Sequence, residues 1–189
     1  GESRGLVQQC FASGDATGSS GVGGLVGLLY ARQVIRCFAS GAAYGGGDVG
    51  GLIGRNDTGT AGRVEECYAT GSVSGAGDRG GLIGDNSSDG IVSACYATGL
   101  VEGTGNVGGL VGSGAGAVRL SLWDVEATGQ TGGASGKGAT TAQMKTTTTF
   151  CNAGWDAYDW VMVDGEYPRL AWEGTGWTPV AVPEPIPLP

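Results

Sequence analysis

The chain has 189 residues, of which 41 are glycine, with a formal net charge of −8 and no histidine. This length is sufficient for one domain with its own core, and the acidic charge argues against a nucleic-acid groove or an anionic membrane surface as a partner. No apolar run approaches membrane-spanning length, and we expect Gly1 to be a mature or trimmed start, because no initiator Met or signal peptide precedes the repeats.

Residues 1–122 repeat one glycine-rich phrase four times. Each copy begins at a cysteine, has a valine three residues earlier, and has a leucine 15 residues later. The cysteines are Cys10, Cys37, Cys67 and Cys95; the valines are Val7, Val34, Val64 and Val92; the leucines are Leu25, Leu52, Leu82 and Leu110. Val118 marks a fifth rung, where Ser121 replaces the cysteine.

These copies predict an all-β fold, a β-solenoid of about four to five coils of 27–30 residues each. A unit this short cannot enclose a core alone, so neighbouring coils must cover its apolar side chains. Glycine, β-branched and aromatic residues without a helical period favour short strands separated by glycine corners. We therefore expect the repeated leucines and valines, including Val118, to stack as structural ladders.

An aromatic residue follows each repeated cysteine: Phe11, Phe38, Tyr68 and Tyr96. Strict alternation along a strand places neighbouring side chains on opposite faces of the sheet. Both positions are nevertheless patterned, which predicts a bend or bulge near each cysteine.

The repeated cysteines admit two interpretations. They form either a buried ladder of small apolar thiols or disulfides between adjacent coils, such as Cys10 with Cys37 and Cys67 with Cys95, because the coil spacing lies within the Cα–Cα range of a bridge. Cys151 lies outside the repeats. Zinc is not expected, because the chain has no histidine and no CxxC pair.

The sequence contains no recognisable catalytic constellation, since the absence of histidine excludes Ser-His-Asp and Cys-His chemistry. Asp48 and Asp78 share one repeat position with Asn106. We interpret this row as turn residues, with a calcium site between Asp48 and Asp78 as the weaker alternative. We expect no enzyme activity and no cofactor.

The first variable turn contains Leu28, Leu29 and Tyr30, whereas the later turns are polar. An apolar turn at this position predicts one of two arrangements. The N-terminal residues fold back over it, or it contacts another subunit.

All five tryptophans lie at or after residue 123. Residues 123–173 are predicted to cap the open end of the last coil, with a short helix at 140–145 that starts at Thr140 or Thr141 and a hairpin over 155–172. Residues 174–189 alternate apolar residues with proline and are expected to be an extended tail.

The segments "VGGLIG" and "VGGLVG", with the preceding "CYATGSVSG", resemble the GLUG motif. This motif occurs in large bacterial surface and secreted proteins, including filamentous-haemagglutinin-like adhesins and some IgA-cleaving metallopeptidases. The resemblance implies an extracellular or cell-surface location in a bacterium. The peptidase activity does not carry over, because a chain without histidine has no HExxH zinc motif.

Two functional hypotheses follow. The favoured one is a non-enzymatic structural protein, a filament subunit or a surface stalk or adhesin segment, whose partners are copies of itself or other surface components. In the filament, tail residues Val182, Ile186 and Leu188 lie against Leu28, Leu29 and Tyr30 of the next copy and cover the edge of its first coil. Upstream coils of a longer protein are the competing cover for that edge. The second hypothesis is a solenoid that binds or degrades carbohydrate.

Overall fold

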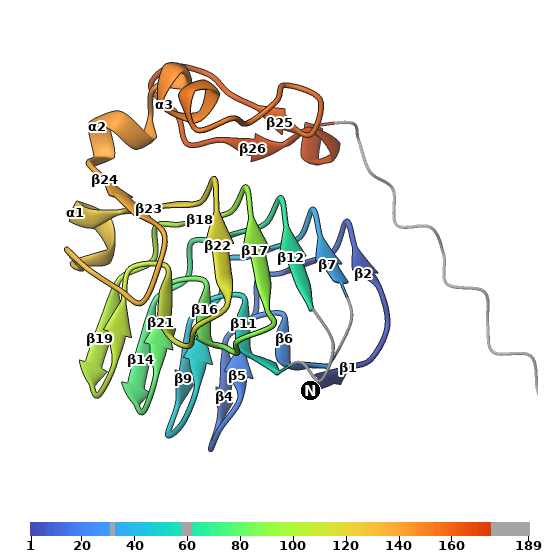
Figure 1. Ribbon diagram of the computed structural model, residues 1–189, viewed down its shortest axis with the longest axis vertical. Coiled ribbons are helices and arrows are strands. Elements are labelled where there is room, and N and C mark those ends of the chain that lie inside the picture. Colours follow the sequence, from blue (N-terminus) through green and yellow to red (C-terminus); the bar gives the residue numbers. More distant parts are fainter. Residues whose placement is uncertain (31–32, 58–61, 175–189) are drawn as a thin grey trace, which may run out of the picture.

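The computed structural model of the protein describes residues 1–30, 33–57 and 62–174. Within them the repeats wind into a stack of coils, and equivalent strands of successive coils lie side by side in five parallel sheets (Figure 1). The predicted β-solenoid is confirmed, and the coil axis runs from β2 towards β22 across Figure 1.

Each coil contributes one strand to each sheet. Sheet A contains β1 (Glu2–Ser3), β6 (Val26–Tyr30), β11 (Ile53–Asp57), β16 (Ile83–Asn86) and β21 (Val111–Ser113). Sheet B contains β2 (Val7–Gln8), β7 (Gln33–Ile35), β12 (Arg63–Glu65), β17 (Ile91–Ser93) and β22 (Ala117–Arg119). Sheet C contains β3 (Phe11–Ala12), β8 (Phe38–Ala39), β13 (Tyr68–Ala69), β18 (Tyr96–Ala97), β23 (Leu122–Asp124) and β24 (Lys137–Ala139).

The last two sheets are shorter and form a narrow lobe. Sheet D contains β4 (Ala16–Gly18), β9 (Ala43–Gly45), β14 (Val73–Ala76) and β19 (Val101–Thr104). Sheet E contains β5 (Val22–Gly23), β10 (Val49–Gly50), β15 (Arg79–Gly80) and β20 (Val107–Gly108). Val22, Val49, Val73 and Val101 pack between these sheets as a second, smaller core.

Equivalent residues of successive coils pair in register. Val34, Val64 and Val92 face one another across sheet B, as do Ile53 and Ile83 across sheet A. The constant spacing within each repeat produces this register, because any slip would turn the inward side chains outward. Length differences between repeats therefore fall in the outward turns.

The main core runs along the coil axis and contains the predicted ladders. Leu52, Leu82 and Leu110 are completely buried. Leu25 is only partly buried, and so are Val7 and Val118, which lie in the first and last rungs of sheet B. A terminal rung has a neighbouring coil on one side only, which explains their greater exposure.

Glycine at the corner before each leucine lets the backbones of adjacent coils approach closely. A Cβ atom at Gly81 would collide with the carbonyl oxygen of Gly109 and would lie 2.8 Å from the Ala97 Cβ. The corner therefore requires glycine in this coil, and small alanines face it from sheet C.

The bend predicted near each cysteine is present. The residue immediately before it has a left-handed backbone, with φ between 50° and 54°, at Gln9, Arg36, Glu66, Ala94 and Leu120, which we call the corner row. After the bend, Cys37, Cys67 and Cys95 point into the main core, while the aromatic residues that follow them belong to a second apolar cluster outside it. Both positions are patterned because both faces of sheet C are covered.

The C-terminal segment differs from the prediction, because only its first part covers the end of the solenoid. Here α1 (Val125–Thr128) follows β23, and β24 adds a sixth strand to sheet C. The Trp123 indole Nε1 donates to the carbonyl of Gln130, 2.8 Å away, and so fixes the connecting segment.

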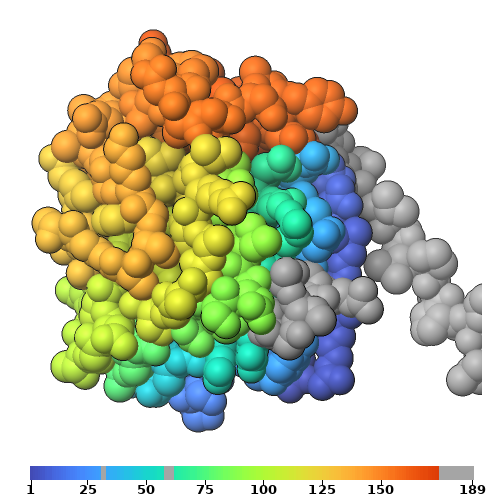
Figure 2. All heavy atoms as spheres, viewed as in Figure 1, coloured from blue at the N-terminus to red at the C-terminus, as the bar shows by residue number. Residues whose placement is uncertain are grey.

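The second part, residues 140–174, runs back along one flank of the coil stack (Figures 1 and 2). We call this part the cap. It contains α2 (Thr141–Met144), α3 (Thr147–Asn152), the antiparallel pair β25 (Trp160–Val161) and β26 (Arg169–Leu170), and a 3₁₀ helix, η1 (Ala171–Gly174). The predicted helix and hairpin are both present, and Thr140 is the N-cap of α2 with a complete capping box.

The cap covers the flank because the aromatic side chains form an outward strip there. Phe11, Phe38, Tyr68 and Tyr96, the aromatic row, stack with ring centroids 5.3, 4.8 and 4.9 Å apart. Trp155, Trp160 and Trp172 of the cap pack against Phe38, Tyr68 and Tyr96. Burying Phe38, Tyr68 and Tyr96 of this strip removes apolar surface from water and so stabilises the position of the cap.

Among the described residues no helix has the length and apolar character needed to cross a membrane.

Candidate functional site

The cysteine row is a structural feature of the core. All five cysteines lie in the described residues and carry free thiols. The Cys67 Sγ accepts from the backbone nitrogen of Cys37 on the preceding coil at 3.4 Å and lies 3.1 Å from the carbonyl oxygen of Glu65 on its own coil. These thiols therefore satisfy backbone groups at the corner, as expected for the buried ladder.

Ser121 takes the place of cysteine in the last rung and makes the same two contacts. Its Oγ accepts from the backbone nitrogen of Cys95 at 3.1 Å and donates to the carbonyl of Arg119 at 2.7 Å. A hydroxyl and a thiol are interchangeable here because the position needs one donor and one acceptor at the bend.

Aromatic and charged side chains surround a pocket where the cap meets the corner row. We call this the flank pocket. It has a volume of about 240 Å³ and is lined by Gln9, Arg36, Tyr158, Asp159, Ala171 and Trp172. The corner row supplies one wall and the cap supplies the other.

Arg36 is held by two carboxylates at the edge of the pocket. Its Nε lies 2.8 Å from a carboxylate oxygen of Glu66 on the next coil and 2.8 Å from one of Asp159 on the cap. Its Nη2 donates to the second oxygen of Asp159 at 3.2 Å. The left-handed bend at Arg36 turns its side chain outward, where Asp159 can reach it.

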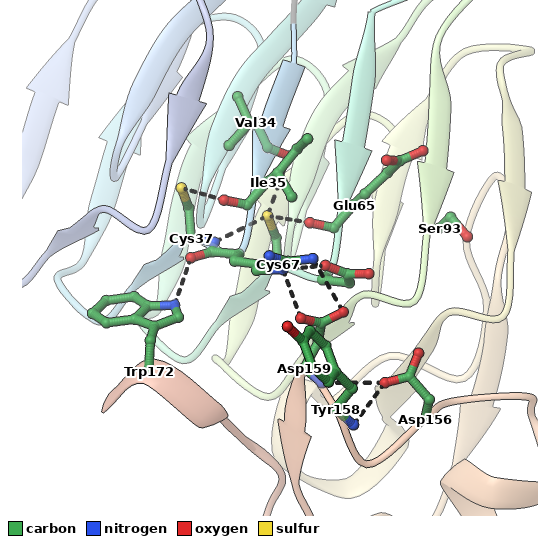
Figure 3. Close-up of polar contacts among 12 residues, drawn as sticks. Val34, Ile35, Cys37, Glu65, Cys67, Ser93, Asp156, Tyr158, Asp159 and Trp172 are labelled. Atoms are coloured by element: carbon green, nitrogen blue, oxygen red, sulfur yellow. Dashed lines mark hydrogen bonds and ion pairs between the residues drawn. The ribbon is translucent and has the colours of Figure 1, made fainter. Parts of the chain in front are cut away.

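The backbone of the same corner also binds the cap. The Trp172 indole Nε1 donates to the Arg36 carbonyl at 2.9 Å, and Figure 3 shows Trp172 and Asp159 approaching the coils from the cap beside Cys37 and Cys67. The walls of the flank pocket are therefore joined by a hydrogen bond and by ion pairs.

The Glu66 carboxylate of this site differs from an ordinary surface acid. Partial burial raises the pKa of Glu66; the hydrogen bond from Arg36 opposes this effect, and the nearby Asp159 carboxylate adds to it. Both carboxylates bind the same guanidinium, which favours a binding surface over a pair of groups that exchange protons with a substrate.

Asp48 and Asp78, the candidate calcium pair, lie on another face. Arg55 approaches Asp48 at 4.0 Å, and Asp78 accepts hydrogen bonds from Asn106 at 2.8 Å and Ser113 at 2.6 Å. Calcium takes about six to eight oxygen ligands. The described residues contain no group of three or more His, Cys, Asp or Glu side chains that could hold a metal ion.

Of the two arrangements expected for Leu28, Leu29 and Tyr30, the structure shows the one in which N-terminal residues cover the turn. Strand β1 pairs with β6, and Leu29 is completely buried at the position that Asn56 occupies in the next coil. The N-terminal residues thus fold back over this turn. Val182, Ile186 and Leu188 lie outside the described residues.

Sequence reasoning missed Arg36, Tyr158 and Asp159. Arg36 and Glu66 share the position before the cysteine, where the other copies carry Gln9 and Ala94. Opposite charges on successive coils at one repeat position were the available signal for an outward ion pair.

A model of the GLUG motif matches residues 45–74. The chain contains a GLUG repeat. The matched segment corresponds to one turn of the solenoid, from the end of β9 to β14, and the other GLUG coils repeat its pattern of valine, cysteine and leucine. The adhesin type that the resemblance implied stays a prediction.

The GLUG solenoid is similar to a crystal structure from Bacteroides ovatus described as a putative immunoglobulin A1 protease. The TM-score is 0.62 at 18% sequence identity, and the match covers 88% of this chain and 57% of that protein. The likeness shows a shared fold, and this chain spans little more than half of that protein's length. No curated protein sequence matches the chain.

Proposed function

We propose that the chain is a non-enzymatic structural module of an extracellular or surface-exposed bacterial protein, and that this 189-residue polypeptide, purified on its own, associates with a second copy through the edge of its first coil. One observation carries this: β1 to β5 are each the terminal strand of their sheet among the described residues. Unpaired strand edges are templates for pairing with another chain. Leu6, beside this edge, is 59% exposed.

The opposite end of the solenoid offers fewer pairing groups. Gly109 donates to the Gly132 carbonyl and Ala134 to the Val111 carbonyl, both at 3.1 Å. Gln130 Nε2 donates to the Val101 carbonyl at 2.8 Å. The segment after α1 therefore occupies bonding positions that a stacked copy would need.

This asymmetry favours a closed pair over the head-to-tail filament expected from the sequence. Two copies related by a two-fold axis can bring the same edge together, with β2 of one copy antiparallel to β2 of the other. Such an isologous contact closes on itself, whereas a filament needs two complementary ends. Gln9 N donates to Ile35 within the chain, so by alternation Gln8 presents its N–H outward.

Sedimentation velocity with a matched pair of variants tests this assembly. Leu6→Lys places a charge at the open edge, and Leu100→Lys makes the same change at a residue that is 45% exposed on a fourth-coil turn. We expect the wild type and Leu100→Lys to be dimeric and Leu6→Lys to be monomeric, with unchanged circular dichroism. A wild type that stays monomeric at high concentration contradicts the assembly. Filaments in electron micrographs would contradict the closed pair and would favour the head-to-tail contact instead.

The absence of histidine supports the non-enzymatic part of the proposal, because it removes the commonest general base and zinc ligand. Incubation with immunoglobulin A1 and with polysaccharide substrates tests it, and cleavage by purified protein would contradict it.

A further inference from the structure

The flank pocket carries an aromatic side chain that the fold itself does not use. The Tyr158 ring is 83% exposed, although it belongs to a tight turn next to the buried Asp159. The turn is fixed, because Asp156 Oδ1 accepts hydrogen bonds from the backbone nitrogens of Tyr158 at 2.9 Å and Asp159 at 3.1 Å. A fixed turn thus holds a large, exposed ring in the lining of the flank pocket, and Figure 3 shows Tyr158 in this turn with Asp156 and Asp159.

The polar groups in the pocket are oriented before any ligand arrives. The ion pairs of Arg36 with Glu66 and Asp159 restrict all three side chains, and the Gln9 amide offers a donor and an acceptor beside them. Sugar hydroxyls both donate and accept hydrogen bonds, so a site for them needs both kinds of group in fixed positions. Fixed groups also reduce the entropy lost on binding.

The size and charge of the pocket narrow the class of ligand. Its volume of about 240 Å³ lies below the roughly 300–1,000 Å³ of pockets for drug-sized ligands, so it suits one sugar ring. Asp159 lines the pocket, and Glu66 and Asp156 lie next to lining residues, so three carboxylates stand against the one guanidinium of Arg36; this acidic balance disfavours carboxylated or sulfated sugars.

From these features we propose that the flank pocket binds a neutral pyranose ring at the end of a glycan, with Tyr158 stacked on the ring and the Arg36–Asp159 pair bonded to its hydroxyls. The site binds without cleaving, since both carboxylates are engaged by one guanidinium. This inference does not rest on assembly through the first-coil edge, although such assembly brings a second copy near Gln9 of the pocket.

The ion pairs and the Trp172 bond would hold the cap in place even without a ligand. Tyr158 separates ligand binding from attachment of the cap, because its exposed side chain takes no part in the Arg36–Asp159 ion pair or in the Trp172 hydrogen bond. Tyr44 provides a matched control, since it is 57% exposed on β9, at the side of the solenoid opposite the cap (Figure 1).

The experiment is an NMR titration of the labelled protein with the methyl glycosides of glucose, galactose, mannose and N-acetylglucosamine, and with that of N-acetylneuraminic acid as the anionic probe. We expect at least one neutral probe to shift the amides of Arg36 and Asp159 with a Kd of about 0.1–10 mM, and the anionic probe to shift none. Tyr158→Ala should weaken binding about tenfold or more, while Tyr44→Ala leaves it unchanged.

Two further variants make the result decisive. Asp156→Ala keeps the ring but releases its turn, and should also weaken binding. The titration is repeated on Leu6→Lys, so that covering of the pocket in a dimer is distinguished from the absence of a site. The inference is overturned if no neutral probe binds either protein at about 50 mM, or if Tyr158→Ala binds as the wild type does.

Discussion

At the scale of single residues, Arg79 is the side chain that departs most from its surroundings. It stands in register with Val49 and Val107 on sheet E, and its side chain is completely buried. None of its three guanidinium nitrogens has a hydrogen-bond partner. Burial lowers the pKa of Arg79, and the Asp78 carboxylate only partly offsets this. A buried cation without a partner is destabilising.

Arg79→Val should therefore stabilise the protein. Valine restores an unbroken row with Val22, Val49 and Val107, and it removes the desolvation cost of the guanidinium. We expect the free energy of unfolding to rise by about 2 kcal/mol or more in chemical denaturation. Arg63→Val, at an exposed position paired with Glu65, is the control and should change it by less than about 0.5 kcal/mol. A less stable Arg79→Val protein would indicate that the guanidinium has a partner in solution.

The cysteines are separated into two classes by burial. Cys37, Cys67 and Cys95 are completely buried, whereas Cys10 and Cys151 are exposed. Burial raises the pKa of the Cys67 thiol well above its ordinary value, and its hydrogen bonds with Cys37 and Cys95 act in the same direction. Accessibility nevertheless decides the class, because the hydrogen bond with Cys67 lowers the pKa of the buried Cys37 thiol and partial burial raises that of the exposed Cys10. A reagent reaches only the exposed thiols quickly.

Titration with a thiol reagent at neutral pH should find two fast-reacting cysteines in the native protein and all five after unfolding without reductant. In Cys151→Ser the number of fast-reacting thiols in the native protein should fall from two to one. Fewer than five thiols in the unfolded, unreduced wild type would favour disulfides between adjacent coils.

At this scale the sequence predicts what repeats and misses what does not. The spacing of Val64, Cys67 and Leu82 indicates the inward ladders because identical steps recur in each copy. The left-handed residue before each cysteine could be anticipated only as a bend, since Arg36, Glu66 and Leu120 are not residues that favour positive φ. The Arg36–Asp159 pair joins residues 123 positions apart, so no local pattern reveals it.

At the scale of elements, Asp124 joins the end of the solenoid to the cap. Its carboxylate accepts from the backbone nitrogens of Glu126 and Ala127 at the start of α1, from Thr141 Oγ1 at 2.9 Å and from Tyr167 Oη at 2.7 Å. Burial alone would raise the pKa of Asp124, but these hydrogen bonds lower it on balance. The charged form is thus favoured in the folded protein.

This gives a defined pH dependence. A carboxyl group with a lowered folded pKa contributes stability above its unfolded pKa of about 3.9, and that contribution is lost as the pH falls through the lower folded value. Asp124→Asn should lower the free energy of unfolding by about 1–3 kcal/mol at pH 7. Both carboxylate oxygens of Asp124 accept hydrogen bonds, whereas an amide has only one accepting oxygen.

The measurement is thermal unfolding of the wild type and Asp124→Asn between about pH 7 and pH 2. The difference in stability should shrink below about pH 4, where the wild-type carboxyl group is protonated. Asp89→Asn, on an exposed turn, is the control and should follow the wild type throughout. A constant difference across this range would mean that the charge of Asp124 has no part in stabilising the cap.

At the scale of the whole molecule, the course of the cap was the least predictable feature. The tryptophans indicated a segment that covers apolar surface, and an open coil end was the evident target. The flank of the coil stack was not an evident target, because predicting it requires knowing that Tyr68 and Tyr96 point outward. Only the paired coils show that the bend directs cysteine and aromatic side chains to opposite faces.

The apolar clusters of the molecule divide between the inside of the coil stack and the contact of the stack with the cap. The main core and the smaller core between sheets D and E contain residues of the first 125 positions only. The third cluster combines the aromatic row, except Phe11, with cap residues such as Met144, Phe150 and Trp160. The coil stack thus has a core of its own, and the cap stabilises it mainly by covering the outward aromatic strip.

Deleting residues 140–189 should therefore leave a folded solenoid with an exposed apolar flank. We expect a strand-type circular dichroism spectrum and cooperative unfolding at a lower temperature, since the inward ladders persist. Phe38, Tyr68 and Tyr96 would then face water, so the truncated protein should bind a hydrophobic dye and self-associate. Replacing Tyr68 and Tyr96 by threonine in the truncated protein should reduce both effects, because threonine suits an exposed strand position without extending the apolar strip. Loss of the strand spectrum on truncation would show instead that the coils require the cap in order to fold.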